Sequence, residues 1–426
     1  MLPEPSRARV AEGSSLTSKP RRLPAQLRLL LGTQFGRFYV GNGLSLVGTW
    51  MQRFACGWLI WDWTHSAFWL GILAAGDLLP VFAIGPFAGV AADRWDRLRQ
   101  NMLAQAVSAL FAVLTAVLLG TGHLGLVGLV LLITAQGTLS AIIQPARLAM
   151  IQQMVPREDV GVAVALNSVN VNLARLLGPA AAGAMILYMD IVWIFAVNAA
   201  VTFLFVLILA RLRLAPHPRR PGTRTFLGEM TEGFVHILRD QALWLILLVM
   251  LCGGSMVRAM VELMPAIAAG TFTDNATGFA VLTGAVAFGA VVSGLTMVSS
   301  SAVRLLYGVL LWWGIGAVAA IVLTQAQSSV IAVIAAMGIG FTVTRALVST
   351  QTFVQLTTPD GLRGRVLSVH GLIARGSPAL GALVIGFAAD RIGLVRAVEV
   401  SSGALILLFL ALVPMTRRAA LKVTDR

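Results

Sequence analysis

Long apolar runs recur along the whole chain, and this feature limits its possible folds more than any other. Each run has about 20 residues, close to the length that a helix needs to cross the hydrocarbon core of a bilayer. They lie at roughly 36–61, 66–91, 99–121, 125–148, 160–187, 191–212, 241–266, 276–299, 303–324, 328–350, 363–388 and 393–415. In lipid, only helices and closed barrels satisfy their own backbone hydrogen bonds. Runs this long predict an all-α membrane protein with twelve transmembrane helices.

Composition excludes most other classes of protein. Charged residues make up 12% of the chain, against about 25% in soluble domains. The net charge of +14 is scattered in short stretches between apolar runs, so we expect no nucleic-acid partner. The two cysteines, Cys56 and Cys252, lie in apolar runs without metal-ligand spacing. We therefore expect no metal, no cofactor and, in the absence of any catalytic motif, no enzyme activity.

Basic residues indicate how the chain is oriented. The loops at 62–65, 122–124, 188–190, 267–275 and 325–327 contain no Lys or Arg, whereas both terminal tails and the connection after the sixth run are basic. Arg391 alone breaks the alternation. The positive-inside rule then places both termini in the cytoplasm. With 30 Arg and 2 Lys among many Ala and Gly, the composition suggests a bacterial inner membrane protein.

The long connection divides the chain into two halves. We predict a basic cytoplasmic tail (1–35), a six-helix bundle (36–212), a cytoplasmic linker (213–240), a second six-helix bundle (241–416) and a short cytoplasmic tail (417–426). Within the linker, apolar residues recur at helical intervals, which fits either an amphipathic helix on the inner membrane surface or an extension of the seventh span. These residues are Phe226, Met230, Phe234 and Ile237.

The two halves resemble each other in sequence. Gly48, Met51 and Arg53 recur 205 positions later as Gly253, Met256 and Arg258, and Arg175 recurs as Arg375. Repeats in the same order at nearly one offset indicate a duplicated six-helix unit. In transporters built this way, the substrate lies between the halves near the bilayer midplane.

Two acidic residues within the apolar runs are candidates for proton coupling. A charge at mid-helix depth costs about 2.5–3.5 kcal/mol on insertion scales, so it is expected to face a partner or a cavity. Asp77 is the first candidate, and a static pair with Arg53 is the alternative. Glu262 lies four residues after Arg258, so the spacing favours an intrahelical pair over a mobile pair broken by a proton or substrate.

Four arginines within the runs are candidates for the substrate site. Arg175 and Arg375 lie in the middle of the fifth and eleventh runs, and Arg53 and Arg258 in the first and seventh. Such cations either attract an anionic substrate or lock helices together by donating to backbone carbonyls.

The loop between the second and third runs resembles the cytoplasmic gate motif of the major facilitator superfamily. The motif has a Gly, an Asp four residues later and then basic residues, which match Gly89, Asp93, Arg94 and Arg97. Asp96 stands where the family usually has Gly. The resemblance implies that Asp93 pairs with a cation or a helix N-terminus when the cytoplasmic side is closed; the alternative is an ordinary solvated loop.

Further motifs point to one branch of this superfamily. Gly178, Pro179 and Gly183 resemble its antiporter motif, although a plain packing kink would use the same residues. The runs 50–53, 85–89 and 145–147 are similar to those of the enterobactin-exporter and macrolide-efflux branch. That resemblance implies the major facilitator fold, with two pseudo-symmetric six-helix bundles, and export.

We therefore expect a secondary active transporter. It exchanges a small organic molecule, siderophore-like or drug-like, for protons by alternating access, and it works as a monomer in the lipid bilayer. Because the sequence has no phosphate-binding Gly-Lys motif, ATP is not expected to drive it directly. Proton-coupled import, lysophospholipid flipping and ligand sensing without transport remain alternatives.

Overall fold

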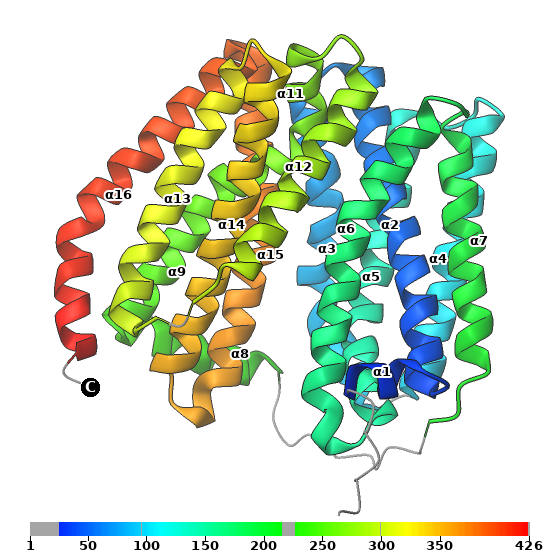
Figure 1. Ribbon diagram of the computed structural model, residues 1–426, viewed down its shortest axis with the longest axis horizontal. Coiled ribbons are helices and arrows are strands. Elements are labelled where there is room, and N and C mark those ends of the chain that lie inside the picture. Colours follow the sequence, from blue (N-terminus) through cyan, green and yellow to red (C-terminus); the bar gives the residue numbers. More distant parts are fainter. Residues whose placement is uncertain (1–24, 95, 215–225, 299, 425–426) are drawn as a thin grey trace, which may run out of the picture.

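Long helices stand side by side in a computed structural model of the chain (Figure 1). It describes residues 25–94, 96–214, 226–298 and 300–424, apart from the side chains of 81–83, 85–94, 226–231 and 423–424. The first-half helices are α1 (Ala25–Leu30), α2 (Gln34–Thr64), α3 (Ala67–Arg94), α4 (Arg97–Gly120), α5 (Leu126–Met154), α6 (Val160–Ile186) and α7 (Val192–Ala210). The second-half helices are α8 (Phe226–Arg239), α9 (Gln241–Gly253), α10 (Ala259–Glu262), α11 (Met264–Thr271), α12 (Asn275–Leu295), α13 (Ala302–Gln325), α14 (Ser329–Thr357), α15 (Asp360–Ile392) and α16 (Leu394–Thr424).

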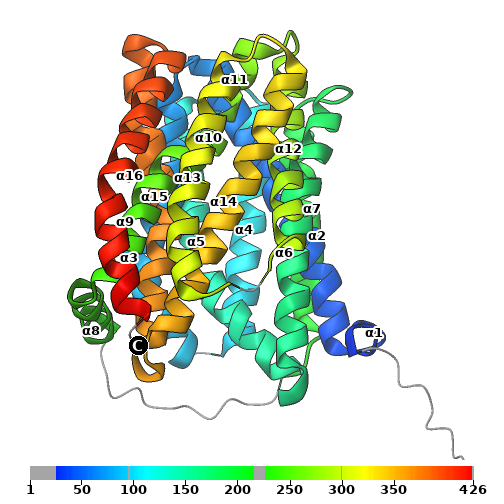
Figure 2. The ribbon, with the colours of Figure 1, turned by 60° about the vertical axis from the view of Figure 1, so that its left-hand side comes forward.

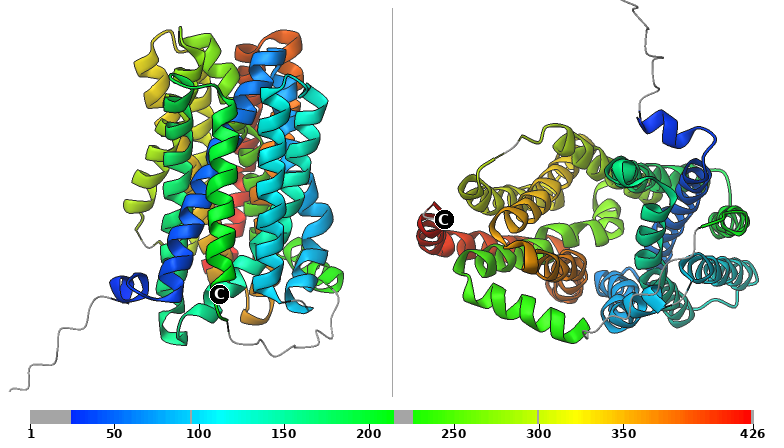
Figure 3. Two further views of the ribbon diagram at one scale, coloured as in Figure 1. Left: turned by 90° about the vertical axis from the view of Figure 1, so that its right-hand side faces the viewer. Right: turned by 90° about the horizontal axis from the view of Figure 1, so that it is seen from below.

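The helices form two bundles, α2–α7 and α9–α16, which separate clearly when viewed from below (Figure 3). Among the described residues, ten helical segments are long and apolar enough to cross a membrane. The other two members of the bundles are α2, whose apolar residues are interrupted by Arg37, Asn42 and Gln52, and α3, whose apolar part is described for Ala67–Pro80. The predicted all-α membrane fold of two six-helix bundles is confirmed.

The first and the last helix that the structure describes, α1 and α16, have their outer termini at the same end of the two bundles. Helix α1 and the end of α16 both lie at the bottom in Figure 1, which we call the proximal end. Arg28 of α1 pairs with Asp159 at 2.7 Å and so holds α1 against the turn that precedes α6. The opposite end, where α2 is followed by α3 and α15 by α16, is the distal end.

Helix α8 is separate from the seventh span, and it lies beside the second bundle at the proximal end (Figure 2). Asp240 ends it and caps α9, because the Asp240 carboxylate accepts hydrogen bonds from Ala242 N at 2.9 Å and Leu243 N at 3.2 Å. Its Glu232 pairs with Arg365 at the start of α15. Of the two predictions for this segment, the separate helix is the one found.

The seventh span is not one regular helix. A π-helical turn, Gly254–Arg258, lies between α9 and α10, and a further break at Leu263 precedes α11. Helix α15 packs closely on this turn: a Cβ on Gly381 would lie 1.5 Å from the carbonyl oxygen of Ser255. Such π turns are frequent at functional sites, and Arg258 is the last residue of this one.

Candidate functional site

An ionic triad of Arg53, Asp77 and Glu262 joins the two bundles. Arg53 of α2 donates Nη1 to Asp77 of α3, in the same bundle, and Nη2 to both carboxylate oxygens of Glu262, at 3.1 and 3.2 Å. Glu262 ends α10 in the second bundle. The three side chains are 39%, 33% and 22% exposed. The predicted Arg53–Asp77 pair is present, and Glu262 extends it across the interface.

The predicted intrahelical pair between Arg258 and Glu262 is not formed. Arg258 lies in the π-helical turn and donates instead to the carbonyl oxygen of Ala374 in α15. The physical reason is that each side chain has another partner, since the Glu262 carboxylate binds Arg53 of the other bundle. Arg258 thus binds a backbone carbonyl, one of the two roles predicted for the buried arginines.

The indole of Trp50 contacts two arginines. It makes cation–π contacts with Arg53, whose Cζ is 5.6 Å from the ring centroid, and with Arg175 of α6, at 5.2 Å. Such contacts hold guanidinium groups on an aromatic face without neutralising their charge. Trp50 therefore links the triad to the mid-helix arginine of α6.

Helix α6 has two different exposed faces. One face is polar and carries Ser168, Asn172 and Arg175. The other is apolar and carries Val169, Leu173 and Leu177. In a membrane protein the apolar face suits lipid, and an exposed charge is expected to face the interior or water. The polar face therefore points to the space between the bundles.

Cationic side chains gather at this interface. Arg175 is close enough to Arg53, Glu262 and Arg375 for their charges to interact. The repeat mates Arg175 and Arg375 are thus brought together, and Arg375 is exposed on α15. The charged groups named so far at this interface are four arginines and two carboxylates, which together carry a net positive charge: Arg53, Arg175, Arg258, Arg375, Asp77 and Glu262.

Arg147 is a further interfacial cation, which the sequence analysis named only within the run 145–147 and not as a candidate for the site. It is 5% exposed and donates to Asn42 at 3.3 Å and Gln144 at 2.8 Å. Its charge also acts on Arg375 across the interface. The fourth span was predicted to end at residue 148, but α5 continues to Met154, so Arg147 lies well inside the helix. Its signal in the sequence was a lone charge within the predicted fourth span, two residues after Pro145.

The bundles also meet at the distal end, in contacts that we call the distal seal. Asp390 near the end of α15 accepts hydrogen bonds from Ser66 Oγ at 2.5 Å and from Ala67 N at 2.9 Å, so it caps α3 of the other bundle. Phe68 and Phe387 pack edge-to-face, with ring centroids 5.9 Å apart. Asp390 fell beyond the predicted end of the eleventh span, and sequence reasoning did not single it out.

The glycines of the antiporter-like motif allow two close helix contacts. A Cβ on Gly178 would lie 2.4 Å from Trp50 Cβ, so this glycine lets α6 approach α2. A Cβ on Gly183 would lie 2.3 Å from Ala280 Cβ of α12, which is in the other bundle. Pro179 is buried inside α6. The motif therefore positions Trp50 and brings the bundles together near the distal end.

The gate motif falls at the end of α3. The side chains of Gly89, Asp93 and Arg94 lie outside the described residues, so their predicted role stays a prediction. Asp96 caps α4 and accepts a hydrogen bond from Arg99 N at 2.9 Å, which accounts for an Asp at this position. Arg97 begins α4. Among the described residues, no group of His, Cys, Asp and Glu could hold a metal ion.

A family model for transmembrane secretion effectors matches residues 27–425. The chain belongs to this family of major facilitator superfamily transporters. It is 24% identical over 398 residues to the staphyloferrin A transporter of Staphylococcus aureus, covering 91% of this chain and 98% of that protein. It is a multi-pass membrane transporter and not an enzyme, as predicted.

Other relatives match over shorter stretches. The enterobactin exporter EntS of Salmonella paratyphi A is 27% identical over 267 residues, covering 62% of this chain and 63% of EntS. The multidrug efflux pump Tap of Mycobacterium bovis is 29% identical over 180 residues, covering 41% of each chain. Among solved structures, an inward-facing bacterial homologue of the lysosomal transporter Spinster superposes with a TM-score of 0.71 at 16% identity, covering 94% of this chain and 98% of that one. This likeness shows the fold.

Proposed function

We propose that the protein is a proton-driven exporter of a small organic molecule across the cytoplasmic membrane. The observation that carries the proposal is the sharing of Arg53 between Asp77 in its own bundle and Glu262 in the other. Arg53 joins the two bundles through the carboxylate of Glu262. A proton bound to that carboxylate therefore changes the free-energy difference between the closed and the open arrangement of the bundles. Relatives named as exporters and efflux pumps favour export as the direction.

The proposed cycle uses the contacts between the bundles. With the distal seal and the Arg53–Glu262 pair formed, substrate enters from the proximal side, which we assign to the cytoplasm together with both termini. A proton that neutralises Glu262 removes the tie, so the distal side opens and releases substrate. Asp93 of the gate motif then helps to close the proximal side. The units that rock are the predicted bundles, 36–212 and 241–416.

Both carboxylates of the triad are proposed coupling groups with different parts. Asp77 keeps Arg53 oriented within its bundle, whereas Glu262 transmits protonation to the other bundle. Arg175 and Arg375, exposed at the interface, attract the substrate, and Arg258 holds the π-helical turn against α15 through Ala374. The proposed cargo is siderophore-like or drug-like.

The test uses inverted membrane vesicles with an acidified lumen. A dye whose fluorescence is quenched by the acidic lumen reports the lumenal pH. Added substrate should raise the fluorescence, because an antiporter releases lumenal protons as it takes substrate in. Staphyloferrin A, enterobactin and a panel of cationic drugs are the compounds to add. A symporter would give no response, since its protons must leave together with lumenal substrate. If no compound releases protons while labelled compound is still taken up, proton antiport is rejected.

Variants then assign the coupling group. Glu262→Gln and Asp77→Asn mimic protonated carboxylates, and Glu399→Gln is the control, because Glu399 contacts Gln325 on α13, away from the triad. A coupling variant should lose gradient-driven export yet retain exchange of substrate for substrate. If Asp77→Asn abolishes both and lowers thermal stability, Asp77 is a structural partner of Arg53. Unchanged export in both variants would reject the triad as the coupling site.

A further inference from the structure

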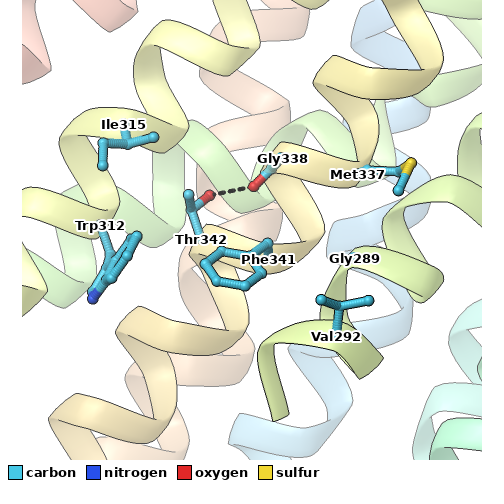
Figure 4. A pocket seen from close by; sticks show the side chains of 8 residues that line it. All are labelled: Gly289, Val292, Trp312, Ile315, Met337, Gly338, Phe341 and Thr342. Atoms are coloured by element: carbon cyan, nitrogen blue, oxygen red, sulfur yellow. Dashed lines mark hydrogen bonds between the residues drawn. The ribbon is translucent and has the colours of Figure 1, made fainter. Parts of the chain in front are cut away.

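A groove opens on the outer side of the second bundle, away from the interface. It lies between α12 and α13, both of which pack on α14. Figure 4 shows its lining, with Val292 from α12, Trp312 and Ile315 from α13, and Phe341 from α14. The pocket holds about 260 Å³. The proposed transport mechanism does not use it.

The groove is apolar and faces the bilayer. Glycines at two of its lining positions, Gly289 and Gly338, leave the space unfilled. The hydroxyl of Thr342, which also lines it, donates to the carbonyl oxygen of Gly338 at 2.9 Å, so it offers no free donor. Next to the groove, Phe288 is 51% exposed and Leu311 58% exposed. Exposed side chains of this kind on a transmembrane bundle indicate contact with lipid chains.

A cation closes the proximal end of the groove. Met337, Phe341 and Arg345 follow one another at four-residue intervals along α14, so they form one row on the groove floor. The Cζ of Arg345 lies 5.3 Å from the ring centroid of Phe341 and 5.7 Å from that of Trp312. Two of the residues that line the groove thus hold this guanidinium.

Arg345 has binding capacity left over. Its Nη2 donates to Thr296 at the end of α12, to the carbonyl oxygen at 2.9 Å and to Oγ1 at 3.1 Å. Its Nε is buried without a partner, and Nη1 makes no hydrogen bond to the described residues. None of the carboxylates that the structure describes lies within ion-pair distance of it. Because Thr296 begins the short loop before α13, the cation lies where α12 leaves the membrane.

We propose that this groove binds an anionic phospholipid of the surrounding bilayer. An acyl chain fills the apolar part over Phe341, and the phosphate accepts hydrogen bonds from Nη1 of Arg345. Charge complementarity favours an anionic headgroup, because a hydrogen bond from a charged guanidinium to a phosphate oxygen is strong. Basic pockets between transmembrane helices on the cytoplasmic side suit such headgroups. Bound lipid would hold α12, α13 and α14 together.

The test is thermal unfolding of the purified full-length chain in detergent. Phosphatidylglycerol is titrated against phosphatidylcholine with the same acyl chains. Phosphatidylglycerol should raise the unfolding temperature at much lower concentration. Arg345→Gln, which keeps a donor for Thr296 but loses the charge, should weaken this response by at least about tenfold, the factor that about 1.4 kcal/mol corresponds to. Arg345→Lys should recover part of it.

Two further variants separate the groove from general surface charge. Gly338→Leu fills the groove, and a Cβ there meets only Ala319 Cβ, at 3.6 Å, so the variant should fold yet bind lipid poorly. Arg211→Gln removes an exposed arginine beyond the proximal end of α7 in the other bundle and should respond like the wild type. The proposal fails if both lipids stabilise the wild type equally. It also fails if Arg345→Gln keeps the full response, or if Arg211→Gln loses as much.

Discussion

Glu262→Gln should shift the bundles toward the state in which the distal side is open. The Arg53–Glu262 contact at 3.1 Å corresponds to a Coulomb energy of about 5 kcal/mol at an effective dielectric constant of about 20. Arg53 is 39% exposed and keeps Asp77 as a partner, so solvent and the remaining pair reduce the net effect to about 1–2 kcal/mol. A change of this size alters a two-state population by a factor of about 5–30.

The population is measured as a distance distribution between two spin labels. Labels at Trp63 near the end of α2 and Thr273 after α11 report the separation of the bundles at the distal end, because both positions are exposed. The native thiols Cys56 and Cys252 are first replaced by alanine. In the wild type at neutral pH we expect most molecules to show one short distance between the labels. In Glu262→Gln we expect a larger fraction of the molecules than in the wild type to show a second, longer distance.

Asp77→Asn is the matched control, because Asp77 binds the same arginine from within one bundle. It should leave the distances nearly unchanged, since the tie to Glu262 remains. Lowering the pH should shift the wild type toward the long distance and leave Glu262→Gln unaffected. Equal shifts in the two variants would refute the reasoning, as would a wild-type pH response that Glu262→Gln retains.

Three other perturbations have defined outcomes. Asp390→Ala removes the cap of α3 and should favour the open distal side by about 1 kcal/mol, seen as a larger share of the long spin-label distance. Gly381→Ala places a Cβ 1.5 Å from the Ser255 carbonyl oxygen and should lower the unfolding temperature clearly, whereas Gly371→Ala, with nothing within 4 Å, should not. Hydrogen bonds from Thr277 and the backbone lower the pKa of Asp274. A lowered pKa stabilises the fold above the ordinary aspartate pKa and loses that effect as the pH falls, so Asp274→Ala should destabilise at neutral pH by about 1 kcal/mol and match the wild type in acid.

The arrangement of spans follows from the sequence because the bilayer imposes a length on each apolar run. The exact helix ends do not follow, since a helix can continue beyond the hydrocarbon. The last run was predicted to end at residue 415, yet α16 continues through Arg417 and Arg418 to Thr424. In the same way α5 extends past the predicted edge at residue 148 to Met154. Hydropathy therefore locates the part of each helix that crosses the membrane, whereas backbone hydrogen bonding determines the residue at which the helix ends.

The candidate site was predictable only in part. The cost of burying charge points to the four arginines and two carboxylates counted at the interface above, and the Arg53–Asp77 pair follows from neighbouring spans. The partner of Glu262 could not be found this way, because it lies in the other bundle, whereas sequence spacing pointed to Arg258, which binds the carbonyl oxygen of Ala374 instead. Asp390 gave no signal either, since it looks like an ordinary loop residue until α15 is placed beside α3.

The triad differs from a simple ion pair in a way that matters for coupling. Were Arg53 tied only to Glu262, loss of that carboxylate charge would leave a cation unpaired, at a cost of several kcal/mol. Because Asp77 also binds Arg53, the arginine stays neutralised when the bundles part. Opening the distal side then costs little free energy. Protonation of Glu262 needs to offset only the net free energy of the Arg53–Glu262 ion pair. We infer that the second carboxylate keeps the two states close enough in free energy for a proton gradient to move the protein between them.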